Sequence, residues 1–279
     1  MILTKRMEAE ISLFPVSGWC IPRNRLSLLF KLIANMNSMV VLLKKEFANF
    51  FSSAIGYLVV GVFLTLTGLF LWVFPGNYNI LDSGYAQLDG LFSLAPWLYL
   101  FLIPAITMRL FAEEKRSGTL ELLFTRPITK WNIVLSKYLA GMLLVAVSLL
   151  PTIVYFISVY YMSDPIGNID VGGFWGSYIG LFLLASVYVA IGLFASSLSD
   201  NQITAFILAV TLSFVFYFGF DLVASLSLSG AKQMAIAALG INNHYTSMSR
   251  GVIDSRDVAY FLSVIGLFLL ATRWRIRAK

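Results

Sequence analysis

Six long apolar stretches alternate with shorter polar segments along the chain. Their approximate bounds are 55–74, 91–108, 137–162, 174–198, 203–228 and 258–272. A bilayer core about 30 Å thick is crossed by about 20 apolar helical residues, and residues 55–74 supply such a run without a single charge. The pattern therefore predicts an all-α membrane protein with six transmembrane helices.

A shorter amphipathic pattern precedes the first span. Its apolar positions are Leu42, Leu43, Phe47, Phe50 and Phe51, and the charged positions opposite are Lys44, Lys45 and Glu46. This predicts an N-terminal interfacial amphipathic helix that includes Lys44, Lys45, Glu46 and Phe47; the alternative is an unstructured stub.

Residues 1–38 show no sustained period, so we predict an N-terminal extension (1–38) ahead of a six-helix domain (39–279). An alternative places the start of translation at Met36 or Met39, which makes residues 1–38 an upstream extension.

The composition agrees with lipid as the main solvent. Hydrophobic residues make up 59% of the chain and charged residues 12%, about half the charged fraction of a soluble domain. This excludes a cytosolic enzyme, a disordered tail and a small secreted scaffold. The single cysteine, Cys20, excludes an intrachain disulfide and a thiolate metal cluster.

The basic residues fall almost entirely into alternate segments between the spans. Of the 20 Lys and Arg, 17 lie before the first span, around the loop between the second and third spans, or after the sixth. The positive-inside rule then places both termini and this loop in the cytoplasm. The net charge of +6 needs no nucleic acid to explain it.

The loop between the second and third spans combines charge with turn residues. Gly118 permits a bend, and Ser117 and Thr119 can accept hydrogen bonds from the free N–H groups of a following helix. Residues 120–124 form a short apolar helix that Pro127 ends, and Thr129 can cap the next one. The pattern predicts a short cytoplasmic helix between two turns.

Four large apolar side chains on this short helix indicate a surface to pack against. They are Leu120, Leu122, Leu123 and Phe124. A partner protein is one explanation. The alternative is that they pack against the lipid interface or against the ends of this protein's own helices.

The same loop resembles a known family motif. The run from Glu113 to Leu123, followed by Arg126-Pro127-Ile128, is similar to the cytoplasmic loop of type-2 ABC transporter permeases. Further stretches at 43–57, 199–202 and 249–257 resemble the gliding-motility (GldF-like) branch. The resemblance extends from about Met39 to the end of the chain.

The resemblance implies a permease subunit of an ATP-driven exporter in a bacterial inner membrane. The loop would be the coupling helix, seated on a separate ABC ATPase that binds ATP and magnesium. The implied contact residues are Glu113, Glu114, Gly118, Thr119, Leu120, Glu121, Leu122, Leu123 and Pro127. A second permease subunit, identical or related, would complete the pore. The chain contains no Gly-x-x-x-x-Gly-Lys-Ser/Thr phosphate loop, so hydrolysis is expected from the partner and no cofactor from this chain.

Three single residues invite other interpretations. Asp221, about 27 Å along the fifth span, is expected to be an anchor near the external headgroups. Lys137 opens the third span and is expected to reach the inner surface. His244, the only histidine, is expected to be packed or solvated, because nearby Met residues lack metal-ligand spacing.

Other functional classes remain as alternatives. A membrane anchor of a motility or secretion complex is one, and a permease of another type-2 ABC system, such as copper-related or lipid export, is another. A secondary transporter fits less well, because the spans hold little ionisable chemistry besides Asp221. An intramembrane enzyme lacks a nucleophile and base at matching depth. The sequence does not identify the transported substrate.

Overall fold

The structure is a computed structural model that describes residues 23–125, 128–226 and 230–276. It divides into two units, Met1–Ser38 and Met39–Lys279. Residues 1–22 of the predicted extension lie outside the described residues. The first described helix, α2 (Arg23–Ser52), contains the predicted amphipathic segment, and everything below concerns the second unit.

Among the described residues, six helical stretches are long and apolar enough to cross a membrane, which confirms the predicted all-α membrane fold with six spans. The first is α3 (Ala54–Trp72), and the second runs through α5 (Asp89–Thr107) and α6 (Arg109–Arg116). The third comprises α8 (Lys130–Leu149), η1 (Leu150–Thr152) and α9 (Ile153–Met162). The fourth is α10 (Val171–Leu198). The fifth comprises α11 (Gln202–Phe214), η2 (Val215–Gly219) and α12 (Phe220–Ser225), and the sixth is α15 (Ser255–Arg275). The described residues contain no strand.

The fourth span is the centre of the bundle. Helix α10 packs against α5, α8, α11 and α15, and 78% of its most apolar window is buried, against 22% for the fifth span. Small residues allow the close approach that packing inside a membrane requires. At Gly192, for example, an added Cβ would lie 2.0 Å from Thr107 Oγ1 of α5.

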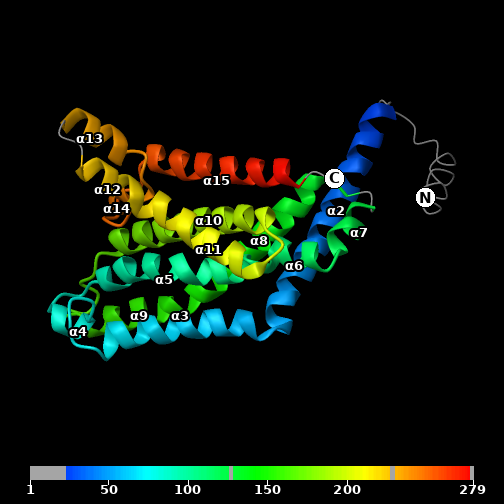
Figure 1. Ribbon diagram of the computed structural model, residues 1–279. Helices are drawn as coiled ribbons and strands as arrows, with labels where there is room; N and C mark the ends of the chain where they lie inside the picture. The colour runs from blue at the N-terminus through cyan, green and yellow to red at the C-terminus, as the bar shows by residue number, and fades with distance from the viewer. Residues whose placement is uncertain (1–22, 126–127, 227–229, 277–279) are drawn as a thin grey trace. The chain divides into compact units, whose positions relative to one another are not determined.

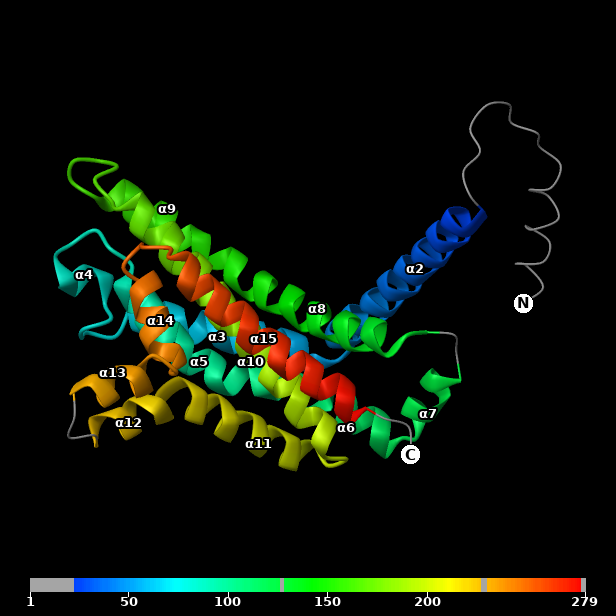
Figure 2. The ribbon, with the colours of Figure 1, turned by 90° about the horizontal axis from the view of Figure 1, so that it is seen from above.

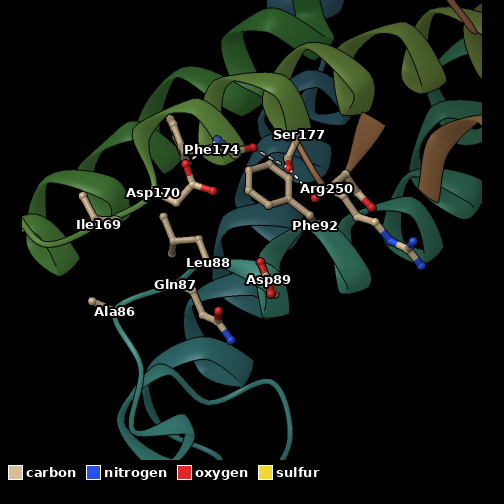
Figure 3. A pocket seen from close by; sticks show the side chains of 12 residues that line it. Ala86, Gln87, Leu88, Asp89, Phe92, Ile169, Asp170, Phe174, Ser177 and Arg250 are labelled. Atoms are coloured by element: carbon tan, nitrogen blue, oxygen red, sulfur yellow. Dashed lines mark hydrogen bonds between the residues drawn. The ribbon is translucent and has the colours of Figure 1, made fainter. Parts of the chain in front are cut away.

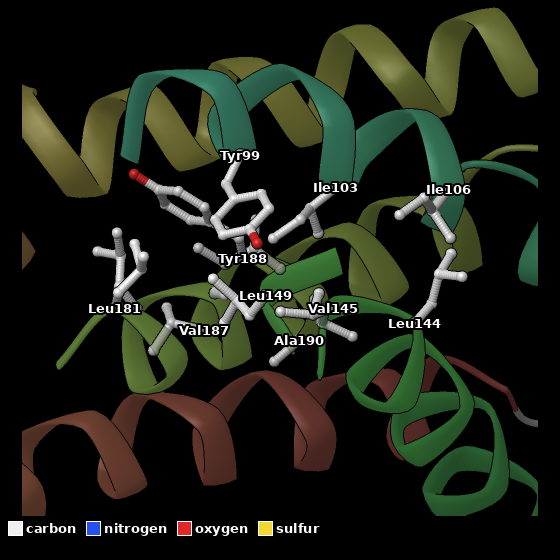
Figure 4. Close-up of a cluster of buried hydrophobic side chains, with 14 of the residues drawn as sticks. Tyr99, Ile103, Ile106, Leu144, Val145, Leu149, Leu181, Val187, Tyr188 and Ala190 are labelled. Carbon is white, nitrogen blue, oxygen red and sulfur yellow. The ribbon is translucent and has the colours of Figure 1, made fainter. Parts of the chain in front are cut away.

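The core between α5, α8 and α10 combines aliphatic side chains with buried tyrosines (Figure 4). The Tyr99 ring stacks on Phe63 of the first span at 4.5 Å, and its hydroxyl lies 2.9 Å from Ser148 Oγ. The hydroxyl is thereby satisfied away from water, which is what a buried polar atom requires. These contacts fix the second span against the first and third.

Two spans depart from regular α-helix at defined places. Pro151 lies in the 3₁₀ turn η1, where its missing N–H interrupts the α-helical hydrogen bonds. In the fifth span the π-helical turn η2 carries Tyr217, and turns of this kind often occur at functional sites. Each departure re-aims the remainder of its span.

The two ends of the bundle differ in the elements that cover them (Figure 1). One end carries α7 (Thr119–Phe124) and the C-terminal end of α15. The other carries α4 (Ile80–Ser83), α13 (Gly230–Ala237) and α14 (Ile241–Met248). Figure 2 shows α8 and α9 along one side and α11 and α12 along the other. We call the two ends the α7 end and the α14 end.

The second helical stretch continues past the expected bound near residue 108. It runs through α6, where Leu110, Phe111 and Ala112 are buried. At the α14 end, Asn242 and Asn243 lie inside α14, and Gly240 precedes that helix with an extended backbone.

Candidate functional site

The candidate site is the helix–turn–helix at the α7 end. Helix α6 ends at Arg116, and Gly118 then adopts φ +71°, a left-handed conformation that favours glycine. The chain reverses and starts α7 at Thr119. The predicted short helix therefore exists, and the Gly118 turn joins it to α6.

The hydroxyls of the turn bind differently from the prediction. Ser117 Oγ donates to the Glu113 carbonyl at 2.9 Å and lies 2.9 Å from Thr119 Oγ1. Thr119 Oγ1 donates to the Glu114 carbonyl at 3.3 Å. Both side chains therefore satisfy carbonyls at the end of α6, and neither caps α7. Thr129 does cap α8 as predicted, because its Oγ1 accepts from Asn132 N at 3.3 Å.

Helix α7 has one face against the protein and one in the open. Leu120 is buried, and Leu123 and Phe124 are half-buried against the core. Leu122, in contrast, exposes 66% of its surface. Most of the apolar surface that the sequence suggested for a partner is thus covered by this protein itself, and Leu122 is the part left open.

A buried ionic cluster lies behind this helix and joins three elements. Lys137 Nζ of α8 is 2.9 Å from Glu114 Oε1 of α6 and 3.1 Å from Glu46 Oε1 of α2. The exposed fraction of the Lys137 side chain is 2%, and those of Glu46 and Glu114 are 8% and 16%. Charges at this depth are stable only when paired. The cluster therefore ties the amphipathic helix, the second span and the third span together.

The periphery of the cluster is exposed. Lys45 Nζ lies 3.8 Å from Glu46 Oε1 and 3.9 Å from Glu114 Oε1, with 54% of its side chain exposed. Lys137 Nζ also lies 5.2 Å from the centre of the Phe111 ring, within the range of a cation–π contact. Two cations thus face two carboxylates, and their formal charges cancel.

Two expectations from the sequence were wrong here. Glu46 does not share the exposed face of Lys44 and Lys45, because it lies on the buried face with Leu42 and Phe50. Lys137 does not extend to the surface. The sequence carried a signal for both, since a lysine within an apolar span is costly to bury without a carboxylate partner.

A polar cavity of about 310 Å³ adjoins the cluster. Its walls include Arg109 and Glu113 from α6 and Ser53, which lies between α2 and α3. The guanidinium of Arg109 donates to Ser53 Oγ. Glu114 Oε2 is buried without a hydrogen-bond partner among the described residues. The region between α2 and α6 is therefore polar and not completely filled.

The opposite side of α6 is fastened to the central helix α10. Ser196 Oγ accepts from the N–H groups of Phe111 and Ala112 at 3.0 and 3.1 Å, and donates to the Met108 carbonyl at 2.8 Å. Lys115 Nζ donates to the Ser197 carbonyl at 2.6 Å. The sequence reasoning missed Ser196, because a serine among small apolar residues gives no signal of a cross-helix contact.

The structure divides the predicted contact residues into two groups. Glu113, Gly118, Thr119, Glu121 and Leu122 are exposed. Glu114 and Leu120 face the protein, and Leu123 is half-buried. Pro127 lies outside the described residues. Of the predicted interfacial residues, Lys44 and Lys45 are exposed, Phe47 is half-buried and Glu46 is buried.

The two candidates at the α14 end are packed. Asp221 Oδ2 accepts from Asn242 Nδ2 at 2.7 Å, so it joins α12 to α14. The His244 ring stacks on Tyr260 at 3.9 Å, and Nδ1 lies 2.7 Å from Asp257 Oδ1. The described residues hold no cluster of three His, Cys, Asp or Glu that could bind a metal. His244 is thus a packed histidine.

The chain matches one known protein family over most of its length. The sequence profile of the family described as ABC-2 family transporter protein covers residues 33–265, which include the amphipathic part of α2, the α6–α7 site and nearly all of the six spans. No curated protein sequence matches the chain significantly.

Proposed function

The chain belongs to the ABC-2 family of transporter proteins, and we propose from this that it is the permease subunit of an exporter driven by a separate ABC ATPase. ATP and magnesium would bind to that partner. Six spans supply the membrane pathway, and the sequence contains no phosphate loop of its own. The energy of ATP hydrolysis would therefore reach this subunit through its contact with the ATPase.

The observation that carries the proposal is the exposed face of α7. Leu122 is 66% exposed, while the other apolar side chains of α7 are buried or half-buried, and Glu121 and Thr119 are exposed beside it. An apolar side chain ringed by polar ones is the usual composition of a protein contact. Since this end of the bundle also carries most of the basic residues, we infer that it faces the cytoplasm, with both termini there.

The cluster around Lys137 and the Ser196 contacts would transmit movement from the ATPase. A push on α7 acts on α6 through the Gly118 turn, and α6 continues into α5 of the second span. Ser196 couples α6 to α10, and Lys137 couples it to α2 and α8. Because these contacts are short and buried, α7 cannot shift without moving at least one span.

We further propose that the protein works with a second permease subunit in a bacterial inner membrane, and that it is of the gliding-motility type. The stretches 43–57, 199–202 and 249–257 support the latter. In this chain they are the end of α2 with the first residues of α3, the turn that Asn201 Oδ1 caps by accepting from Ile203 N at 2.9 Å, and the loop that leads into α15 with the first residues of that helix. The subtype rests on resemblance in these stretches.

The test is co-purification with a candidate ABC ATPase from the same genome. Leu122→Asp should weaken association at least about tenfold, because a charge replaces the central apolar contact. Leu81→Asp is the matched control: Leu81 is 57% exposed, but it lies on α4 at the α14 end. Equal ATPase binding by wild type, Leu122→Asp and Leu81→Asp would overturn the assignment of α7.

Glu114→Lys tests a different step. Its carboxylate faces Lys137, so the substitution would leave the exposed face of α7 intact while it disrupts the cluster. We expect the ATPase to bind this variant but transport to fail. Loss of binding with an intact fold would instead assign Glu114 to the contact surface.

A further inference from the structure

A cavity at the α14 end combines aromatic walls with two opposite charges. Its volume is about 370 Å³, within the usual range for small-ligand sites. The walls include Phe92, Trp97, Tyr217 and Tyr245, and Asp89 and Arg250 lie at the same cavity. A smaller cavity of about 200 Å³ adjoins it and shares Asp89, Phe92 and Arg250 (Figure 3).

The aromatic walls are held in place by specific contacts. Tyr245 Oη donates to the Phe92 carbonyl at 2.6 Å, which joins α14 to α5. Trp97 meets Tyr217 edge to face at 5.7 Å. The π-helical turn Val215–Gly219 carries Tyr217, so the irregular part of the fifth span forms one side of the cavity. The site is preformed and needs little reorganisation to bind a ligand.

The two charged side chains are held at the cavity by the backbone around them. Asp89 lies in the first turn of α5, where the helix dipole favours an anion. Arg250 follows α14 in a segment fixed by Ser177 Oγ, which donates to the Ser249 carbonyl at 2.7 Å. An added Cβ at Gly176 would lie 2.7 Å from Gly251 Cα, so this segment is pressed against α10.

Both charged side chains are exposed and accessible to a ligand. Among the described residues, Asp89 and Arg250 form no ion pair with each other or with another side chain. Asp170, at the edge of the smaller cavity, is occupied as the cap of α10, since Gly173 N donates to its Oδ1 at 2.8 Å. The cavity thus offers a ligand one carboxylate, one guanidinium and several aromatic rings.

We propose that this cavity binds a zwitterion that carries an ammonium group and a phosphate, as in phosphoethanolamine. The ammonium fits against aromatic rings beside a carboxylate, and the phosphate fits the guanidinium of Arg250. Asp89 would repel a purely anionic ligand, and Arg250 would repel a purely cationic one. The two charges therefore select against ligands that carry only one.

The same chemistry occurs in a phospholipid headgroup and in a soluble phosphodiester. A role of this cavity in holding or releasing cargo rests on the proposed transport function. Binding of the ligand to the cavity does not involve the ATPase. Binding is therefore measured on the purified full-length protein alone. Failure of the Leu122→Asp experiment would leave this measurement unaffected, so the two proposals fail independently.

The first arm of the test uses glycerophosphoethanolamine and follows tryptophan fluorescence, because Trp97 lies in the wall. We expect saturable binding, at least about tenfold tighter than that of inorganic phosphate or ethanolamine alone, since each of these probes can form only one of the two charge-assisted contacts. Arg250→Gln and Asp89→Asn should each weaken binding about tenfold or more. Arg256→Gln is the matched control, an exposed arginine at the same end that lines neither cavity.

The second arm asks whether the protein retains phosphatidylethanolamine in preference to phosphatidylglycerol, by native mass spectrometry from nanodiscs that contain both. Retention that falls in Arg250→Gln and Asp89→Asn supports the lipid source, and binding in the first arm supports the soluble one. The proposal is overturned if neither probe binds, if a singly charged probe binds as well, or if both variants bind like wild type.

Discussion

Removal of the Lys137 charge is the sharpest test of the buried cluster. In Lys137→Met the apolar stem is kept, but two carboxylates lose their partner at 2.9 and 3.1 Å. Glu46 and Glu114 stay largely buried on either side of the gap. Each then keeps the cost of desolvation without its attraction, and the two like charges repel.

The magnitude follows from this burial. Removal of one partner from a buried ion pair typically costs about 3–5 kcal/mol, because the remaining charge is left uncompensated. Since one lysine serves two carboxylates here, we expect the free energy of unfolding to fall by at least that amount. Lys45→Met is the control. It removes the same charge near the same oxygens, but the 54% exposure of Lys45 limits the loss to less than about 1 kcal/mol.

The assay is SDS-induced unfolding of the purified protein in mixed micelles, followed by circular dichroism. The triple variant Glu46→Gln, Lys137→Met, Glu114→Gln should recover most of the stability, because the unpaired charges are then gone. Equal stability of Lys137→Met and Lys45→Met would refute the reasoning, and so would a triple variant as unstable as Lys137→Met.

Three further predictions concern contacts elsewhere in the bundle and use the same unfolding assay. Ser196→Ala should cost about 1–3 kcal/mol, because the buried N–H groups of Phe111 and Ala112 lose the hydroxyl that accepts from both of them; a loss under about 0.5 kcal/mol would contradict this. Gly192→Ala should cost about 1–3 kcal/mol, since its Cβ would clash with Thr107, whereas Gly61→Ala, which meets nothing within 4 Å, should be neutral or stabilising. Burial raises the pKa of Tyr245 well above its ordinary value of 10.0, so folding favours the protonated form and stability should fall as the pH rises above about 10. Tyr245→Phe should remove that part of the fall, and an unchanged pH profile would count against the buried hydroxyl.

Much of the fold follows from local sequence. The six spans are recognisable because lipid tolerates only backbone that satisfies its own hydrogen bonds, so length and apolarity are sufficient signals. The short helix at 119–124 was also predictable, since Gly118 and the apolar run after it act over a few residues. The sequence did not show that Leu122 is the exposed leucine of this helix, because its pattern does not distinguish the leucines that pack on the bundle from the one that does not.

The candidate site required contacts that no local pattern contains. Glu46, Glu114 and Lys137 are separated by up to 91 residues, and only the packing of α2 and α8 on α6 brings their charges together. Asp89 and Arg250 meet at one cavity for the same reason. In each case the sequence supplied a charge and its element, and the tertiary structure supplied the partner.

The sequence by itself determined that the chain is an all-α membrane protein with six spans, and predicted which end carries the basic residues and the short helix. These properties depend on neighbours along the chain and on the solvent each segment prefers. Only the tertiary structure decided that Lys137 is a buried link and that Leu122 is the exposed leucine of α7. Burial depends on which helices pack together, and that is fixed by side chains far apart in sequence.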